Sequence, residues 1–397
     1  MSESQPQRRS RVLSPELLAK VESALQKGAS SERFEGLLTD AIDGSAGGVY
    51  EALKLGSSRM LAEHAVIREG FERRLQETWR PALESFEVVM VACEEAGSDL
   101  HHALHAASVP ESGHPIKLHA LTLLHARACM VTYEVFALLR CGFAAGAQAR
   151  WRTLHELAVI ANVLGDGDEE LSNRFLLHRF VERWKEAQCY QENCRALGRE
   201  PFSAEEMESF RSDYDEVTGQ YESGYSDDWG WSKPLFASPA HRPKFDQLEK
   251  LAGLGHNKPF VNLSHHAIHA GASGALDVLE LHGGGEVMLA GASDGDLVEP
   301  AHGALIAMYQ VTVAMVLHGP DEVLPEDLLV LRAIAPLLDD AGDAFADCDS
   351  RLLSGQKPPR RAYRARAWAR LRRLRFRLQS VGGRRAFPEA SPPDDSL

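Results

Sequence analysis

The sequence lacks several features that would place it in a familiar class. No stretch of eighteen apolar residues free of charge occurs, so we expect no transmembrane segment. Residues 1–11 are polar and basic without an apolar h-region, so we expect no secretory signal and a cytoplasmic location. The six cysteines include no Cys-x-x-Cys pair, which favours reduced thiols over a disulfide framework. Alternating strand and helix patterns are also absent, which argues against a parallel-sheet enzyme.

Charge is distributed unevenly along the chain. Lys and Arg number 43 against 57 Asp and Glu, a formal net charge of −14. Residues 357–385 nevertheless contain twelve Lys or Arg and no acid, so the remainder of the chain is strongly acidic. An acidic body with one basic segment predicts a partner for that segment, inside the molecule or outside it.

Helical patterns dominate the rest of the sequence. Ser14-Pro15-Glu16 is typical of a helix start, and Leu121 opens a run of apolar residues at helical spacing that ends at Gly142. We therefore predict an all-α fold: a multi-helix bundle with an N-terminal helical layer and a basic C-terminal helix. The predicted order is a disordered start (1–12), the helical layer (13–105), the core bundle (117–354), a basic amphipathic helix (360–379) and a disordered tail (380–397).

An ordered set of short motifs runs through residues 117–317. It consists of Cys141-Gly-Phe143, Arg152-Thr-Leu-His-Glu156, Trp229-Gly-Trp231 and Leu263-Ser-His-His-Ala-Ile-His269. This order resembles domain of unknown function 5677, an uncharacterised bacterial family. The resemblance implies an all-helical fold and carries no established activity. The histidine that corresponds to the family position is His265, His266 or His269.

Arg152 and Glu156 lie one helical turn apart on a face that also carries Val159 and Val163. Charges on an otherwise apolar face must satisfy each other or a third group, since burying an unpaired charge is costly. The pair is therefore either a structural ion pair or a site in which Arg152 binds an anionic group and Glu156 acts as a base or ligand.

Histidines cluster in the segment that begins at Ser264. His265 and His269 lie one helical turn apart, a spacing by which a helix presents two imidazoles to one metal ion. A carboxylate from a facing helix would complete such a site: Glu134, Glu156 or Glu182. The alternatives are proton transfer by a histidine such as His269, or one buried histidine beside exposed ones.

Arg150 and His155 have the Arg-x4-His spacing that resembles the catalytic motif of helical HEPN ribonucleases. In that motif the Arg holds a phosphate while the His assists attack by a 2′-hydroxyl, without a metal. Side chains five residues apart on a helix point about 140° away from each other, so the two need not face one site. Trp229 and Trp231 could line a pocket or stack on a base, although loop tryptophans usually fill the edge of a core.

The predicted basic helix carries an apolar stripe with arginines around it. Such arginines suit phosphate oxygens, an acidic protein surface, an anionic membrane or the acidic body of the chain itself. The residues expected to contact nucleic acid are Arg364, Arg366, Arg370, Arg373 and Arg377.

Three functions follow from these patterns. The first is a nucleic-acid-associated protein with metal-independent, ribonuclease-like activity of a defence or toxin type, using Arg152, Glu156 and His269 and no cofactor. The second is a helical metalloenzyme that binds a divalent metal through His265, His269 and Glu156. The third is a non-catalytic interaction protein in which these polar groups only specify the bundle.

Overall fold

The structure is a computed structural model of the 397-residue chain. It describes residues 31–106, 115–238, 241–272, 280–282, 287–318 and 323–355, together with positions 19, 23, 26 and 274. Contacts divide the chain into two compact units, Met1–Glu77 and Thr78–Leu397. The predicted basic helix at 360–379, the tail after it and the segment 1–12 lie outside the described residues.

The described part of the first unit is almost entirely one long helix, α2 (Ser31–Thr78). The sequence predicts an interruption near Gly44–Gly48, but the helix runs through these glycines without a break. Each glycine in a helix costs about 1 kcal/mol relative to alanine, which weakens a helix without ending it. α2 ends at Thr78 and the next helix begins at Arg80, so the chain breaks one turn at most before Pro81.

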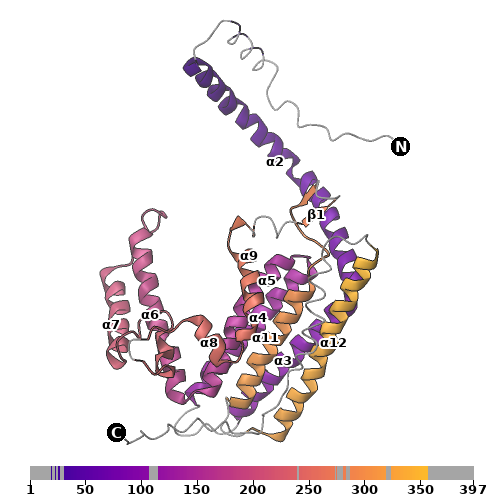
Figure 1. Cartoon of the computed structure of the whole chain (residues 1–397). Coiled ribbons are helices and arrows are strands. Elements are labelled where there is room, and N and C mark those ends of the chain that lie inside the picture. Colours follow the sequence, from indigo (N-terminus) through magenta and orange to yellow (C-terminus); the bar gives the residue numbers. More distant parts are fainter. Residues whose placement is uncertain are drawn as a thin grey trace, which may run out of the picture. The chain divides into compact units, whose positions relative to one another are not determined.

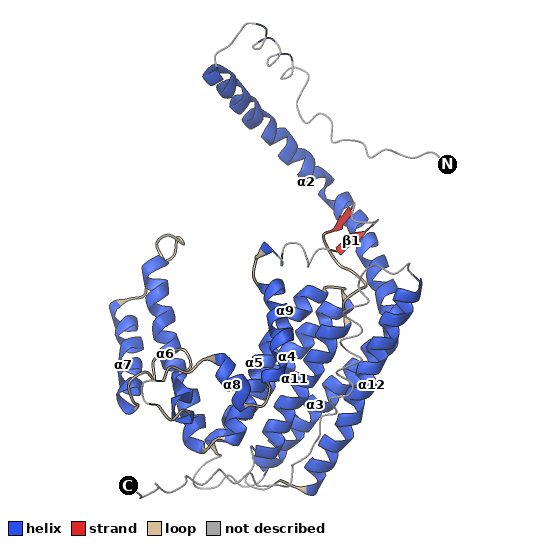
Figure 2. Cartoon of the chain, in the orientation of Figure 1, coloured by secondary structure: helices blue, strands red, loops and turns tan. Residues whose placement is uncertain are grey.

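The second unit is a helical bundle, so the predicted all-α fold is confirmed (Figures 1 and 2). Its main helices are α3 (Arg80–Ala106), α4 (Ile116–Arg140), α5 (Ala144–Asp166), α11 (Val298–His318) and α12 (Pro325–Gly355). α11 lies against the four others. α3 packs against α12, α11 and α4, so this segment, which the sequence analysis groups with the N-terminal layer, is part of the bundle.

Aromatic and aliphatic side chains fill the bundle core. Trp79 and Phe345 lie with ring centroids 5.7 Å apart, and Phe86 stacks on Phe136 at 5.3 Å. Close backbone approach is required between α5 and α11, where a Cβ at Gly303 would come within 2.6 Å of the indole nitrogen of Trp151. This contact fixes the rotation of α5 about its axis.

Two bundle helices, α4 and α11, are long and apolar enough by composition to cross a membrane. In the described structure, 44% of the apolar window of α4 and 61% of that of α11 are buried by the rest of the protein. Core helices of soluble proteins have the same composition, so the predicted cytoplasmic location stays a prediction.

A helical pair follows α5. It consists of α6 (Glu169–Asn193) and α7 (Ala204–Gln220), which pack on each other. Ser203 caps α7 through a reciprocal pair of hydrogen bonds with Glu206, as the sequence predicts. The loop after α7 contains a short 3-10 helix, η1 (Gly230–Leu235), which packs on α6.

Shorter elements complete the second unit: α8 (Phe245–Leu251), η2 (Gly255–Asn257) and α9 (Lys258–Ile268). The sequence predicts a helix over 262–281, but α9 ends at Ile268 and His269 already has extended backbone angles. Strands β1 (Glu280–His282) and β2 (Val287–Leu289) form an antiparallel hairpin in which Leu281 pairs with Met288. The segment after His269, Ala270-Gly-Ala-Ser-Gly274, contains two glycines, which lower the helix propensity there.

Candidate functional site

The turn before α5 sets the direction of the helix that carries the candidate residues. Gly142 has φ 79° at the end of α4, a left-handed conformation that glycine adopts without strain. The amide of Phe143 donates to the carbonyl of Leu138 across this turn. α5 then runs back along α4 and α11, and its remaining face packs on α8 and α9.

Arg152 and Glu156 lie on the face of α5 directed at α8 and α9. Nη1 of Arg152 is 2.8 Å from Oε1 of Glu156, and the guanidinium lies over the ring of Phe245 at 4.7 Å. The Arg152 side chain is 14% exposed, whereas that of Glu156 is 40% exposed. Nη1 is buried from solvent, and Glu156 is the one acidic residue that forms an ion pair with Arg152 among the described residues.

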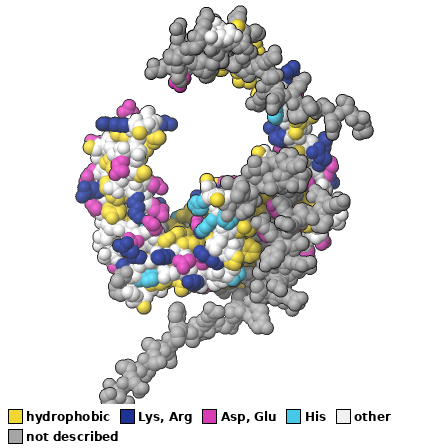
Figure 3. Space-filling view, turned by 45° about the horizontal axis from the view of Figure 1, so that its top comes forward, with side chains coloured by type: hydrophobic (Ala, Val, Ile, Leu, Met, Phe, Trp, Pro, Cys, Tyr) yellow, Lys and Arg dark blue, Asp and Glu magenta, His cyan; other side chains and the backbone are white. Residues whose placement is uncertain are grey.

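The α9 histidines adjoin this pair. His265 and His269 are exposed, and their rings meet edge to face with centroids 5.6 Å apart. His266 is half-buried. Figure 3 shows a group of histidine side chains gathered on one face of the molecule. We name Arg152, Glu156, Phe245, His265 and His269 the Arg152 cluster.

Two side chains of the cluster have pKa values displaced in opposite directions. Partial burial raises the pKa of Glu156 above its ordinary value, although the nearby Arg152 opposes this shift. Partial desolvation lowers the pKa of His265, and the positive charges of Arg152 and His269 lower it further. Arg152 contributes to both shifts, in keeping with the packing of α9 against α5.

His155 belongs to a different, sealed pair. Its Nε2 lies 2.9 Å from Oε1 of Glu249 on α8, and both side chains are at most 2% exposed. Its ring stacks on Trp151, and Nζ of Lys258 lies 3.9 Å from the second oxygen of Glu249. Burial lowers the pKa of His155, although the hydrogen bond to Glu249 opposes this shift. A group so enclosed orders the core and cannot touch a ligand.

Arg150 faces away from His155. Its Nε lies 2.5 Å from Oε2 of Glu134 on α4, and Nη1 donates to Thr153. The structure therefore places the two members of the predicted Arg-x4-His motif on different sides of α5. Their angular separation on a helix accounts for this difference.

The other residues that the sequence suggested for the site pack against or hydrogen-bond to neighbouring parts of the protein. Ser264 is buried and donates to the carbonyl of Val261 within α9. Trp231 is buried edge to face against Phe175. Trp229 is half-buried, and its ring lies 5.3 Å from that of Phe245, so it supports the ring on which Arg152 lies.

A metal site is not formed by the described residues. No group of three or more His, Cys, Asp or Glu side chains among them could hold an ion together, so His265, His269 and Glu156 do not make a ligand set in this structure. The predicted basic-helix residues, Arg364 to Arg377, lie outside the described residues.

Sequence reasoning missed Glu249 and Phe245. In the short helix α8, Phe245, Leu248, Glu249 and Ala252 fall on one face by their spacing. A carboxylate on such an apolar face is a signal of a buried partner, and this signal could have identified Glu249.

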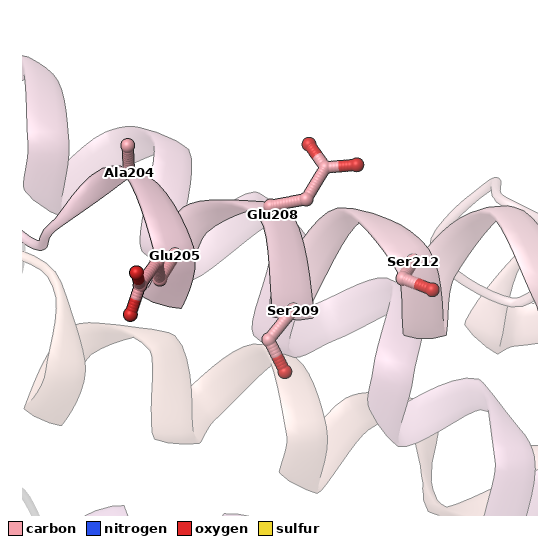
Figure 4. A pocket seen from close by; sticks show the side chains of 5 residues that line it. All are labelled: Ala204, Glu205, Glu208, Ser209 and Ser212. Atoms are coloured by element: carbon pink, nitrogen blue, oxygen red, sulfur yellow. The ribbon is translucent and has the colours of Figure 1, made fainter.

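An open depression lies elsewhere, on α7. Figure 4 shows that all its lining side chains come from this one helix: Ala204, Glu205, Glu208, Ser209 and Ser212. No second element contributes a side chain to it, so it has no convergent groups with which to recognise a ligand.

Residues 118–286 match the model of a family of unknown function (DUF5677). The match includes α5, α8 and α9, and hence the whole Arg152 cluster. No match was found among curated proteins or solved structures. The predicted resemblance is thus confirmed over these residues, and it brings no established activity with it.

Proposed function

We propose that this chain, whose residues 118–286 match the DUF5677 family model, binds RNA at the Arg152 cluster and cleaves it without a metal ion. The observation that carries the proposal is the guanidinium of Arg152, which lies over the ring of Phe245 and 2.8 Å from Glu156 with 14% of its side chain exposed. Its charge also lowers the pKa of His265 on α9, the helix that packs against α5.

Arg152 is suited to bind a phosphate oxygen. Its planar guanidinium is oriented by Phe245 and by Glu156, so little side-chain freedom remains to be lost when a ligand binds. The Arg152 side chain is 14% exposed, so part of it remains accessible to a ligand. A charge-assisted hydrogen bond to a phosphate oxygen is the contact for which a guanidinium is best suited.

Glu156 and His265 supply an acid and a base. A raised pKa keeps Glu156 protonated to a higher pH than an ordinary carboxyl, and a lowered pKa keeps His265 neutral to a lower pH, so the acid and base forms coexist most readily below neutral pH. His265 would take the proton of a ribose 2′-hydroxyl as its oxygen bonds to phosphorus. Glu156 would give a proton to the departing 5′-oxygen. The products are a 2′,3′-cyclic phosphate and a 5′-hydroxyl, and no redox partner is required.

The composition of the C-terminal segment favours a long polyanion over a small phosphate. Residues 357–385 carry twelve Lys or Arg and no acid, whereas the chain as a whole has a net charge of −14. Such a segment supports RNA binding through backbone phosphates, with an affinity that falls steeply with salt. It would hold the RNA while the Arg152 cluster acts on one phosphate.

The test is cleavage of a fluorescently labelled, single-stranded RNA of mixed sequence in excess EDTA, with products identified by mass spectrometry. We expect a 2′,3′-cyclic phosphate product, and a loss of about 100-fold in rate for Arg152→Lys and Glu156→Gln. The matched controls are Arg211→Lys and Asp215→Asn, because these residues form an exposed pair of the same i,i+4 geometry on α7. Both controls should cleave at the original rate.

Three results would contradict the proposal. One is absence of both RNA binding and cleavage by the full chain. Another is equal activity of Arg152→Lys and Arg211→Lys. The third is cleavage of the corresponding DNA, which has no 2′-hydroxyl to attack.

A further inference from the structure

The helix α2 carries an exposed apolar stripe. Ile42, Val49, Leu53, Met60 and Ile67 follow one another at intervals of seven, four, seven and seven residues. Their exposed fractions range from 37% to 68%. Intervals of seven and four keep side chains on one face of a helix and place all five residues at a or d positions of a heptad repeat, the pattern of a two-helix seam.

The same helix has apolar side chains off this stripe, which provide a comparison. Leu55 and Leu61 are 86% and 64% exposed, but they do not continue the 3.5-residue repeat. In heptad terms, Ala46, Leu53, Met60 and Ile67 take the a positions, and Ile42, Val49 and Gly56 take the d positions. A repeat of this kind is complementary to another helix of the same design.

Charge distinguishes the two ways in which such helices could pair. Residues 31–53 contain five acids and one base, whereas residues 54–77 contain five bases and four acids. A parallel pair would place the two acidic halves together, where they repel. An antiparallel pair would place each acidic half beside the half that carries five bases.

We propose that α2 forms an antiparallel coiled coil with α2 of a second copy of this chain. In the register that we propose, each residue lies opposite the partner residue whose number adds to its own to give 109. Every a position then lies opposite a d position. Ile42 then packs on Ile67 of the partner subunit, and Val49 packs on Met60 of the partner subunit. Leu53 fits beside Gly56 of the partner subunit, so the larger side chain fills the space left by the smaller one.

Glu63 also occupies a d position, and this register leaves room for its charged side chain. Glu63 would face Ala46 of the partner subunit, and its contact with Arg59 at 3.6 Å lies on its own helix. The two-fold axis passes between residues 54 and 55. The interface is therefore self-complementary and closes as a dimer without leaving a free end for further growth.

Sedimentation equilibrium of the full chain tests the dimer. We expect twice the chain mass of 43.7 kDa. Leu53→Glu should weaken the association by about 100-fold or more, because the dimer would contain two such charges in its seam. Leu55→Glu is the matched control, since it makes the same change on the opposite face of the helix and should leave the dimer intact. A monomeric wild-type chain, or equal behaviour of the two variants, would overturn the proposal.

Cross-linking tests whether the two α2 helices pair antiparallel and whether the partner is a second copy of the chain. Chains carrying Ile42→Cys and Ile67→Cys should form a disulfide when mixed and oxidised gently, above the background of the unaltered chain, whereas Ile42→Cys alone should not. Cross-linking of Ile42→Cys with itself would mean a parallel pair and would contradict the antiparallel arrangement. If a chain that lacks residues 357–397 loses the dimer, the stripe pairs with that basic segment instead. A retained dimer supports a second copy.

Discussion

Arg174 of α6 and Arg152 of α5 are both largely buried arginines on consecutive helices, but they differ in how completely their donors are satisfied. The guanidinium of Arg174 binds Glu222 with both terminal nitrogens, at 3.1 and 2.7 Å, and its Nε donates to the carbonyl of Trp231. It also lies over the ring of Tyr221 at 4.3 Å. Arg152 has one acidic partner, Glu156, which it meets through a single nitrogen at 2.8 Å, and one aromatic ring.

This difference separates a structural arginine from one that is available to a ligand. Arg174 is 5% exposed and ties α6 to the loop after α7, and the hydroxyl of Tyr225 donates back to the carbonyl of Arg174. A ligand would have to break these bonds before it gained any. Arg152 has a single acidic partner, which is 40% exposed, so a ligand would have fewer bonds to replace there.

The largest expected effect is on stability, from Arg174→Met. The change leaves the carbonyl of Trp231 and the carboxylate of Glu222 without their donor, so we expect the free energy of unfolding to fall by about 3 kcal/mol. Urea denaturation followed by circular dichroism measures it. A loss below about 1 kcal/mol would mean that the Arg174 network is not structural.

Arg152→Met should have little effect on stability and a large effect on RNA cleavage. We expect a change in unfolding free energy of less than about 1 kcal/mol, because the methionine keeps the contact with Phe245 and Glu156 can turn to water. RNA cleavage should fall by about 100-fold or more. A large loss of stability together with lost cleavage would place Arg152 in the same structural class as Arg174.

Disrupting the buried pair of His155 and Glu249 should also lower the stability of the protein, but by less than the loss of Arg174. Glu249→Gln removes the charged acceptor of His155, and we expect unfolding to become easier by about 1–2 kcal/mol. Cleavage by the folded variant should stay within about threefold of the original rate, because Glu249 is 2% exposed and cannot touch a ligand. Single-turnover rates at low temperature, where the variant remains folded, separate the two effects.

The smallest expected effect is the change in stability with pH that Glu222 and Glu156 cause. Burial alone would raise the pKa of Glu222, but the hydrogen bonds and charge of Arg174 lower this pKa by more, so its net shift is downward. The contribution of Glu222 to stability is therefore lost as pH falls through its folded pKa. The pKa of Glu156 is raised, so its ionisation opposes folding at neutral pH and this penalty disappears as pH falls below its unfolded pKa.

Two neutral variants measure this difference. At pH 7, Glu222→Gln should be slightly less stable than the original chain and Glu156→Gln slightly more stable, each by less than about 1 kcal/mol because both groups are exposed enough for solvent screening. Both differences should shrink as the pH falls, that of Glu156→Gln at the higher pH because the pKa of Glu156 is raised and that of Glu222 is lowered. The same sign for the two variants at pH 7 would contradict the assigned environments.

Most of the fold follows from local signals in the sequence. Gly142 and Ser203 mark a helix end and a helix start because glycine adopts left-handed angles and serine accepts from a free amide. The continuity of α2 through Gly44–Gly48 was missed, since a weak helix former is not a stop signal. Placing α3 in the bundle required its tertiary contacts with α11 and α12, which no local pattern contains.

The site is predictable only in part. Helical spacing places Arg152 beside Glu156 correctly, because four residues make about one turn. It does not show that His155 is sealed by Glu249, since that contact joins residues 94 apart in the chain. The same limit applies to Arg150, whose partner Glu134 lies on the preceding helix.

The most direct test of the account is the rate at which the full chain produces a 2′,3′-cyclic phosphate from RNA in EDTA, measured side by side for Arg152→Lys and Arg211→Lys. The account predicts that the first variant loses about 100-fold and the second loses nothing. Equal rates for these two variants would contradict it.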